Sequence, residues 1–232
     1  MPHTIDGRCR HVACEARAAP GQPAADTDVR MKDTMDRKRF EQQLFFLKEI
    51  DKIKNVLRHT PILDGSRYEN DAEHAWHLAV MAITLAEYAN SDGLDISRVV
   101  KMVLLHDVVE IDAGDTLVYD SVRRAEQREE ESRAAARIFG LLPPGQREAL
   151  MSLWEEFEAR KTPEAQFAAA LDRLEPILQN VSTQGHAWRK HGISREKAET
   201  VNRHIGEGSD DIWEYVQQLF AESEAKGYFA DK

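Results

Sequence analysis

The 232-residue sequence has only two cysteines and no apolar run of about 18 residues, the length that a membrane-spanning helix needs. Its N-terminus also lacks the apolar core of a secretory signal. We therefore expect a cytoplasmic protein without a membrane partner. Positive charge is scarce as well, because 31 lysines and arginines stand against 41 aspartates and glutamates, which gives a net charge of -10. This balance, with no basic face, argues against a nucleic-acid polymer as partner, although a small phosphorylated ligand would need only a few local cations.

The N-terminal segment is poor in residues that build a core. Residues 1–36 contain no Leu, Phe, Tyr or Trp, and their centre is rich in Ala, Pro and Gly. This composition predicts a disordered leader over residues 1–35 and one folded domain over residues 36–232. Cys9 and Cys14 lie in the leader with His11 between them, but the set lacks the paired spacing of a zinc site, so we expect no metal there.

Beyond the leader, apolar residues recur at the spacing of amphipathic helices, whereas strand-like alternation and internal repeats are lacking. We therefore expect an all-α fold. Asn70 or Asp71 is placed to cap one helix, and Thr162-Pro163-Glu164 combines a capping hydroxyl with proline at the first helical position. The predicted helices cover about 40–57, 71–89, 99–113, 121–139, 150–157, 163–181, a segment after residue 194, and 209–227.

One predicted helix carries charges where a core helix would not. From Val99 onward it is apolar nearly all the way round, as in a helix buried inside a domain. Yet it contains the doublet His106-Asp107, then Glu110, and it ends at Gly114. Charged side chains almost never lie in a core unless they are paired or bind a metal ion. We therefore interpret this stretch as part of a metal site.

Two more polar residues fall beside the apolar faces of helices. His74 lies one position before the small-residue face of its helix, and Asp172 lies at the edge of the apolar face of its helix. Pro176 denies the Asp172 carbonyl its helical hydrogen bond, so we expect a kink there. Together with His106 and Asp107, these residues give two imidazoles and two carboxylates. Such a set suits one first-row divalent ion, such as Mn, Co, Fe or Zn, with water at the open positions.

Each polar residue taken alone has an ordinary explanation. A single histidine such as His77 is more often a packed or surface residue than a ligand, and we expect His204 to lie on the surface. Asp112 and Asp120 are expected to cap helices or to lie in solvent. Asp172 by itself would be a salt-bridge carboxylate. A metal site is favoured because one arrangement explains four residues together.

These motifs resemble the HD-domain metal-dependent phosphohydrolases, in which a His, a His-Asp doublet and a distant Asp lie on helices. The likeness is closest to the 5'-deoxynucleotidase branch, which removes phosphate from deoxynucleoside monophosphates. It rests on three stretches, which are residues 69–74, 106–115 and 170–172. The resemblance implies an HD-domain helical bundle with one divalent ion between the core helices, Mg being a further candidate, and with these ligands: His74, His106, Asp107 and Asp172.

The resemblance also implies roles for residues beside the metal. Glu110 would serve catalysis, and Asp115 would serve catalysis and contact the substrate. Arg58, at the end of the first helix, matches a phosphate-binding arginine. The next residue, His59, replaces a Trp that packs near the sugar in the best-matching relatives, which leaves the preference for deoxyribose open. The chemistry agrees, because Glu110 lies one helical turn beyond His106, where it could orient a water or shuttle a proton.

The sequence thus predicts a phosphomonoesterase for nucleoside 5'-monophosphates, deoxynucleotides in particular, and the resemblance favours a homodimer. Two alternatives stay open. One is hydrolysis of nucleoside triphosphates or guanosine tetraphosphate on the same fold, although few extra cations are evident near the site. The other is a metal-stabilised helical binding module without turnover, against which the intact Glu110 and Asp115 argue.

Overall fold

Most of the chain that the computed structural model describes is helical, as the apolar spacing predicts. The described residues are 35–230, except for the side chains of residues 121, 122, 124 and 125. The predicted leader and its cysteines therefore lie almost entirely outside the described residues. Within the described range no helix is long and apolar enough to cross a membrane. The α-helices are α1 (Arg37–Ile50), α2 (Asp71–Thr84), α3 (Ile96–Leu105), α4 (Glu110–Ala113), α5 (Ser121–Phe139), α6 (Pro144–Ala159), α7 (Pro163–Ser182), α8 (His186–Lys190), α9 (Arg195–Asn202), α10 (Ile205–Gly208) and α11 (Asp210–Ala225).

The two predicted helix starts are confirmed by their hydrogen bonds. At α2, the Asn70 side chain accepts from the Glu73 amide (3.1 Å), and the Glu73 side chain accepts from the Asn70 amide (3.4 Å), which forms a capping box. At α7, the Thr162 hydroxyl accepts from the Ala165 amide (3.2 Å) and Pro163 opens the helix. Helix α7 then continues through its internal proline to Ser182. These caps fix where the two longest site-bearing helices begin.

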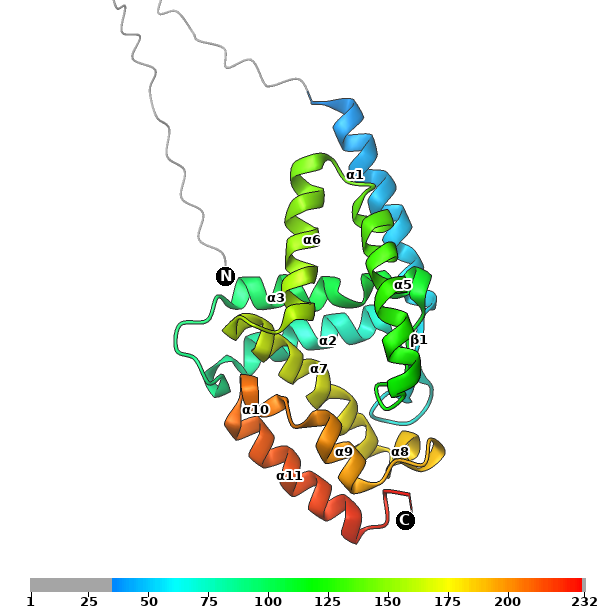
Figure 1. Ribbon diagram of the computed structural model, residues 1–232, viewed down its shortest axis with the longest axis vertical. Helices are drawn as coiled ribbons and strands as arrows, with labels where there is room; N and C mark the ends of the chain where they lie inside the picture. Colours follow the sequence, from blue (N-terminus) through cyan, green and yellow to red (C-terminus); the bar gives the residue numbers. More distant parts are fainter. Residues whose placement is uncertain (1–34, 231–232) are drawn as a thin grey trace, which may run out of the picture. The chain divides into compact units, whose positions relative to one another are not determined.

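The main core forms around α7, which packs against α2, α3, α6, α10 and α11. Helices α2 and α3 lie side by side, and both contact α7 (Figure 1). Phe167, Leu171 and Leu174 supply the buried face of α7. A second apolar cluster joins α5 and α6 to Phe46 of α1. Helices α2 and α3 thus pack in this core against α7, which comes much later in the chain.

The segment after α1 departs from the predicted all-helical pattern. Helix α1 ends at Ile50, a 3-10 helix, η1, covers Asp51–Asn55, and a two-stranded antiparallel sheet follows. Its strands are β1 (Leu57–Pro61) and β2 (Tyr68–Asn70), with Leu57 opposite Asn70 and Pro61 opposite Tyr68. The predicted first helix is therefore too long, and Arg58 and His59 lie on a strand rather than at a helix end.

The predicted central helix is also broken. Helix α3 ends at Leu105, and the 3-10 helix η3 (His106–Val109) carries the His-Asp doublet before α4 begins. The expectation of burial on all sides is wrong as well, since Val99 is fully buried whereas Leu104 is 46% exposed. Similarly, α2 ends at Thr84, and the short 3-10 helix η2 (Ala86–Tyr88) follows. The doublet therefore sits at a change of helix type, where the backbone turns more tightly.

Candidate metal centre

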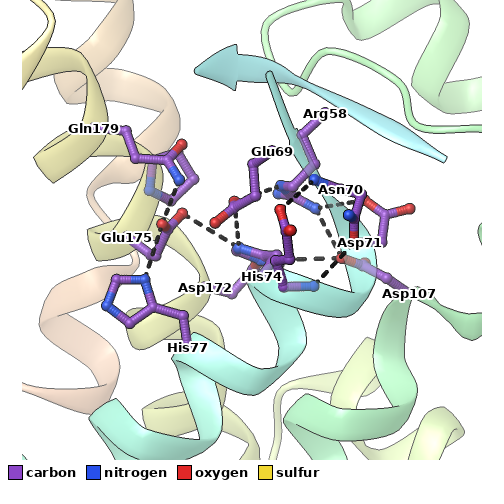
Figure 2. A network of polar contacts seen from close by, with 12 residues as sticks. Arg58, Glu69, Asn70, Asp71, His74, His77, Asp107, Asp172, Glu175 and Gln179 are labelled. Carbon is purple, nitrogen blue, oxygen red and sulfur yellow. Dashed lines mark hydrogen bonds and ion pairs between the residues drawn. The ribbon is translucent and has the colours of Figure 1, made fainter. Parts of the chain in front are cut away.

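Four side chains converge where α2, η3 and α7 meet, and three of them, His74, Asp107 and Asp172, are labelled in Figure 2. Asp172 Oδ1 lies 3.0 Å from His74 Nε2 and 3.5 Å from His106 Nε2. Asp107 Oδ1 lies 3.0 Å from His106 Nε2, and Asp107 Oδ2 lies 3.9 Å from His74 Nε2. The structure therefore brings together the four residues predicted as metal ligands.

Both imidazoles direct Nε2 at this centre. His106 Nδ1 lies 2.9 Å from the Val103 carbonyl oxygen, and because a carbonyl oxygen only accepts, Nδ1 carries the proton. His106 Nε2 is buried and has no hydrogen-bond partner, although Asp107 Oδ1 is close. His74 Nδ1 donates to Glu175 Oε2 (3.2 Å), which leaves its Nε2 facing the centre. Two imidazole nitrogens and nearby carboxylate oxygens fit a first-row divalent cation, and such an ion would satisfy the orphaned nitrogen.

Arg58 reaches the centre from β1. Its Nη1 donates to Asp107 Oδ2 (2.8 Å) and to Asp71 Oδ1 (3.3 Å), and its Nε lies 3.8 Å from Glu69 Oε2. The guanidinium is thus shared among three carboxylates and its side chain is only 9% exposed. Burial and the charge of Asp107 raise the pKa of Asp71 to about 7 despite the nearby guanidinium. Neither Glu69 nor Asp71 was predicted as a site residue.

Glu110 and Asp115 border the same centre. Glu110 is buried at the start of α4, and its Oε2 has no hydrogen-bond partner. Burial, together with the charges of Asp107 and Asp115, raises the pKa of Glu110 well above its usual value. The protonated form of Glu110 is therefore favoured relative to that of an exposed glutamate. Asp115 follows Gly114, whose φ of 75° is one that few other residues adopt, and it lines the cavity beside Arg58 and Asp107.

A second layer of polar groups lies behind His74, and sequence reasoning missed it. Glu175 is fully buried and accepts hydrogen bonds from His74 Nδ1, from His77 Nδ1 (3.2 Å) and from the side-chain amide of Gln179 (Figure 2). Glu69 Oε2 lies 3.5 Å from His74 Nδ1 on the same side. His77 is half-buried, in line with a packed histidine, although its bond to Glu175 connects it to the centre. A carboxylate behind a ligating histidine fixes the ring and strengthens it as a ligand.

Three cavities meet at this centre. The cavity of about 90 Å³ is lined by the ligand candidates His106, Asp107 and Asp172. A polar cavity of about 550 Å³ shares Asp172 and Arg173 with it. A third cavity, of about 70 Å³, shares Arg58, Asp115 and Arg173 with the first. Room for a larger molecule therefore lies next to the candidate ligands, across side chains that line both spaces.

His59 lines the smallest of these cavities and not the one that holds the ligand candidates. Its ring packs edge-on against His191, with ring centroids 5.4 Å apart. Arg58 and Asp115 also line that cavity. A group bound there would lie within reach of all three residues predicted to contact substrate.

Two further polar residues were misjudged from the sequence. Arg173 Nε and Nη2 donate to Asp172 Oδ2 at 3.2 and 2.6 Å, which adds one cation beside the site that was not predicted. The only feature of the sequence that pointed to Arg173 was its position next to Asp172. His204, expected on the surface, is half-buried and lines the 550 Å³ cavity. Burial and the charge of Arg173 lower the pKa of His204 to about 4. Asp120 caps α5, and Asp112 pairs with Arg137, as expected of ordinary carboxylates.

Comparison with known proteins relates this geometry to others. The 5'-deoxynucleotidase HDDC2 of Danio rerio is 30% identical over 190 residues, which cover 73% of this chain and 93% of that protein. The Homo sapiens protein of the same name is 34% identical over 137 residues, 59% of this chain and 65% of that protein. A crystal structure of a predicted metal-dependent phosphohydrolase from Magnetospirillum magnetotacticum MS-1 is similar with a TM-score of 0.78 and 48% identity, and the match covers 83% of this chain and 99% of that one.

The family follows from the extent of these matches. The HD domain family matches residues 50–213, which is more than half of the chain and includes every candidate ligand. The Danio rerio relative is matched over nearly its whole length. The resemblance drawn from the sequence motifs is thereby confirmed, and the chain belongs to the HD domain family.

Proposed function

We propose that this protein is a divalent-metal-dependent phosphohydrolase that converts nucleoside 5'-monophosphates, deoxynucleotides in particular, to nucleoside and inorganic phosphate. One observation carries the proposal. Two buried imidazoles from different elements present Nε2 to one point between two carboxylates, and an arginine and a buried carboxyl whose pKa is raised lie beside it. The names of the HDDC2 relatives support the choice of substrate.

The residues that would hold the ion are His74, His106, Asp107 and Asp172. A divalent ion at such a centre lowers the pKa of a water and neutralises charge on a phosphate oxygen. The protein's own groups complete the site. Glu175 and the Val103 carbonyl accept from the Nδ1 atoms of His74 and His106 and so orient both rings, and Arg58 offers a guanidinium to the phosphate. Since phosphoryl transfer needs mainly positioning and charge neutralisation, these groups suffice for the binding step.

Glu110 donates the proton that the leaving 5' oxygen needs. Because burial and the nearby carboxylates raise the pKa of Glu110, its protonated form is favoured, and this form donates a proton to the 5' oxygen as the P–O bond breaks. The attacking water forms the new P–O bond and gives up a proton, which returns Glu110 to its starting state. Asp115 accepts a hydrogen bond from a sugar hydroxyl beside this group. The products are the nucleoside and inorganic phosphate, so atoms and protons balance.

Phosphate release tests the proposal. The full chain is stripped with a chelator, reloaded with Mn, Co, Fe, Zn or Mg in turn, and assayed with a panel of ribo- and deoxynucleoside monophosphates. The panel includes a deoxynucleoside triphosphate and guanosine tetraphosphate, which test the alternative hydrolase. We expect release from monophosphates with at least one ion. No release from any compound with any ion would leave a metal-stabilised binding module as the better description.

Sugar preference is tested at position 59. A pocket rejects a 2'-hydroxyl well only when a bulky or apolar group leaves it unpaired or clashing, whereas a histidine can hydrogen-bond to it. We therefore expect weak discrimination between dAMP and AMP, and His59→Trp should raise the ratio of the two kcat/KM values. One small group usually gives a discrimination of only ~10–200-fold. If kcat/KM of the natural protein for AMP is already more than about a thousandfold below that for dAMP, a residue other than His59 determines the sugar preference.

The proposal also retains two expectations from the sequence, a cytoplasmic location and assembly as a homodimer. The absence of an excess of basic residues supports a small nucleotide rather than a polymer as substrate. Sedimentation of the purified chain would establish the oligomeric state.

A further inference from the structure

Arg173 is a half-buried cation where the three cavities adjoin. It lines each of them, and its side chain is only 14% exposed. Two of its guanidinium nitrogens, Nε and Nη2, donate to a single oxygen, Asp172 Oδ2. The other oxygen of that carboxylate faces His74 and His106. The guanidinium therefore lies directly beside the candidate metal centre, on the outer side of one ligand.

The charge of the central cavity makes this cation significant. Within the described chain, Arg58 and Arg173 are the two arginines that line it, beside the candidate ligand His106. Its acidic lining residues are Asp107, Glu110, Asp115, Glu131, Glu158 and Asp172. A phosphate monoester carries up to two negative charges. It would be repelled from this cavity unless cations offset the negative charge of both the lining residues and the phosphate.

Arg58 alone is poorly placed to supply all of that positive charge. It already lies within 4 Å of three carboxylates, at 2.8, 3.3 and 3.8 Å. Arg173, in contrast, pairs with its sequence neighbour Asp172 through one oxygen. The two arginines also form ion pairs with different candidate ligands, Arg58 with Asp107 and Arg173 with Asp172. A phosphate between them would meet a guanidinium from either side.

We propose that Arg173 is a second phosphate-binding residue, which together with Arg58 holds the phosphate of the substrate over the metal centre. This inference rests on the proposed function for the identity of the substrate but concerns the phosphate group alone. A guanidinium suits the role because its planar fork donates two parallel hydrogen bonds to phosphate oxygens. A purely structural arginine would instead act only by orienting Asp172 as a ligand. The two roles differ in what is lost when the charge is removed.

Direct binding of inorganic phosphate distinguishes them. Calorimetry is carried out on the Mn-loaded full chain, with metal content measured by elemental analysis and folding by thermal unfolding. The variants are Arg173→Gln and Arg173→Lys, and the matched control is Arg147→Gln, which changes an exposed arginine on α6. Arg173→Gln should weaken phosphate binding about 10- to 150-fold, the loss expected for hydrogen bonds to a charged group, while metal content and unfolding temperature stay at the wild-type values.

Arg173→Lys should fall between wild type and Arg173→Gln, because lysine keeps the charge but not the fork. Arg147→Gln should bind phosphate as the wild type does. Unchanged phosphate binding in Arg173→Gln would overturn the inference, and so would a loss of metal large enough to account for the weaker binding. This readout needs no turnover. If the wild type released no phosphate from any nucleotide but bound phosphate through Arg173, the proposed function would fail and this inference would stand.

Discussion

Glu175 offers the sharpest test of how the candidate metal centre is supported. It touches no expected substrate and no expected ion, yet its two oxygens accept hydrogen bonds from His74 and His77, each at 3.2 Å. Burial alone would raise its pKa, but the hydrogen bonds from His74 and His77 outweigh burial and hold the pKa at about 2. Glu175 is therefore ionised at neutral pH, with both oxygens available as acceptors.

Glu175→Gln keeps the shape but turns one oxygen into a donor. The new side chain is unable to accept from both histidines, and the charge behind His74 is gone. Loss of such an outer partner typically weakens metal binding about 10- to 100-fold, or roughly 1.4–2.7 kcal/mol. Because Glu69 Oε2 remains 3.5 Å from His74 Nδ1, we expect the single variant near the tenfold end. The double variant with Glu69→Gln should approach the hundredfold end.

Competition with a fluorescent chelator measures the metal dissociation constant directly. The control is Glu222→Gln on α11, which removes an exposed carboxylate whose pairing is with Lys226. Thermal unfolding of the metal-free proteins shows whether each variant folds. A folded Glu175→Gln with a dissociation constant within about twofold of the wild type would refute the reasoning, since it would mean that His74 needs no charged acceptor behind it.

Three further outcomes are expected. Asp107→Ala should lose bound metal and activity while circular dichroism stays helical, and full metal occupancy by elemental analysis would contradict its role as a ligand. Glu110→Ala should keep the ion while the rate falls roughly 10²–10⁴-fold, whereas metal loss in proportion to rate would make Glu110 a ligand. The folded-state pKa of His204 is about 4, below the ordinary value near 6.5, so its contribution to stability is present above pH 6.5 and is lost as pH falls toward 4. Urea unfolding should show a loss of about 2 kcal/mol between pH 7.5 and pH 5, and His204→Gln should lose less, so an identical decline in both proteins would rule this out.

The parts of the fold that were predicted correctly depend on residues that lie close together in the sequence. The capping box at Asn70 and the hydroxyl cap at Thr162 each join residues three positions apart. The four ligand candidates were found for a related reason, because an imidazole or carboxylate beside an apolar helix face is rare enough to require a partner. Local pattern and residue type together therefore placed the helices and the centre.

The two strands escaped prediction because their signal is not local. They are five and three residues long, and β1 continues the apolar spacing of α1. Their pairing joins Leu57 to Asn70 across a turn, which single-segment periodicity does not register. The error matters for function, because extended backbone at Arg58 directs its side chain to Asp107 on η3 and Asp71 on α2.

The supporting side chains of α7 escaped prediction for a different reason. Glu175 meets His74 across 101 positions of sequence, and Asp172 meets it across 98, so only the folded chain reveals either contact. Residues 172–175 of this helix supply three groups of the site. Asp172 is a candidate ligand, Arg173 is the cation that pairs with Asp172 Oδ2, and Glu175 is the acceptor behind His74. Successive residues of a helix are about 100° apart, so a slip of α7 by one position would displace all three groups together. The buried apolar face of α7 that fixes its rotation against α2 and α3 is therefore as much a determinant of the site as the polar residues themselves.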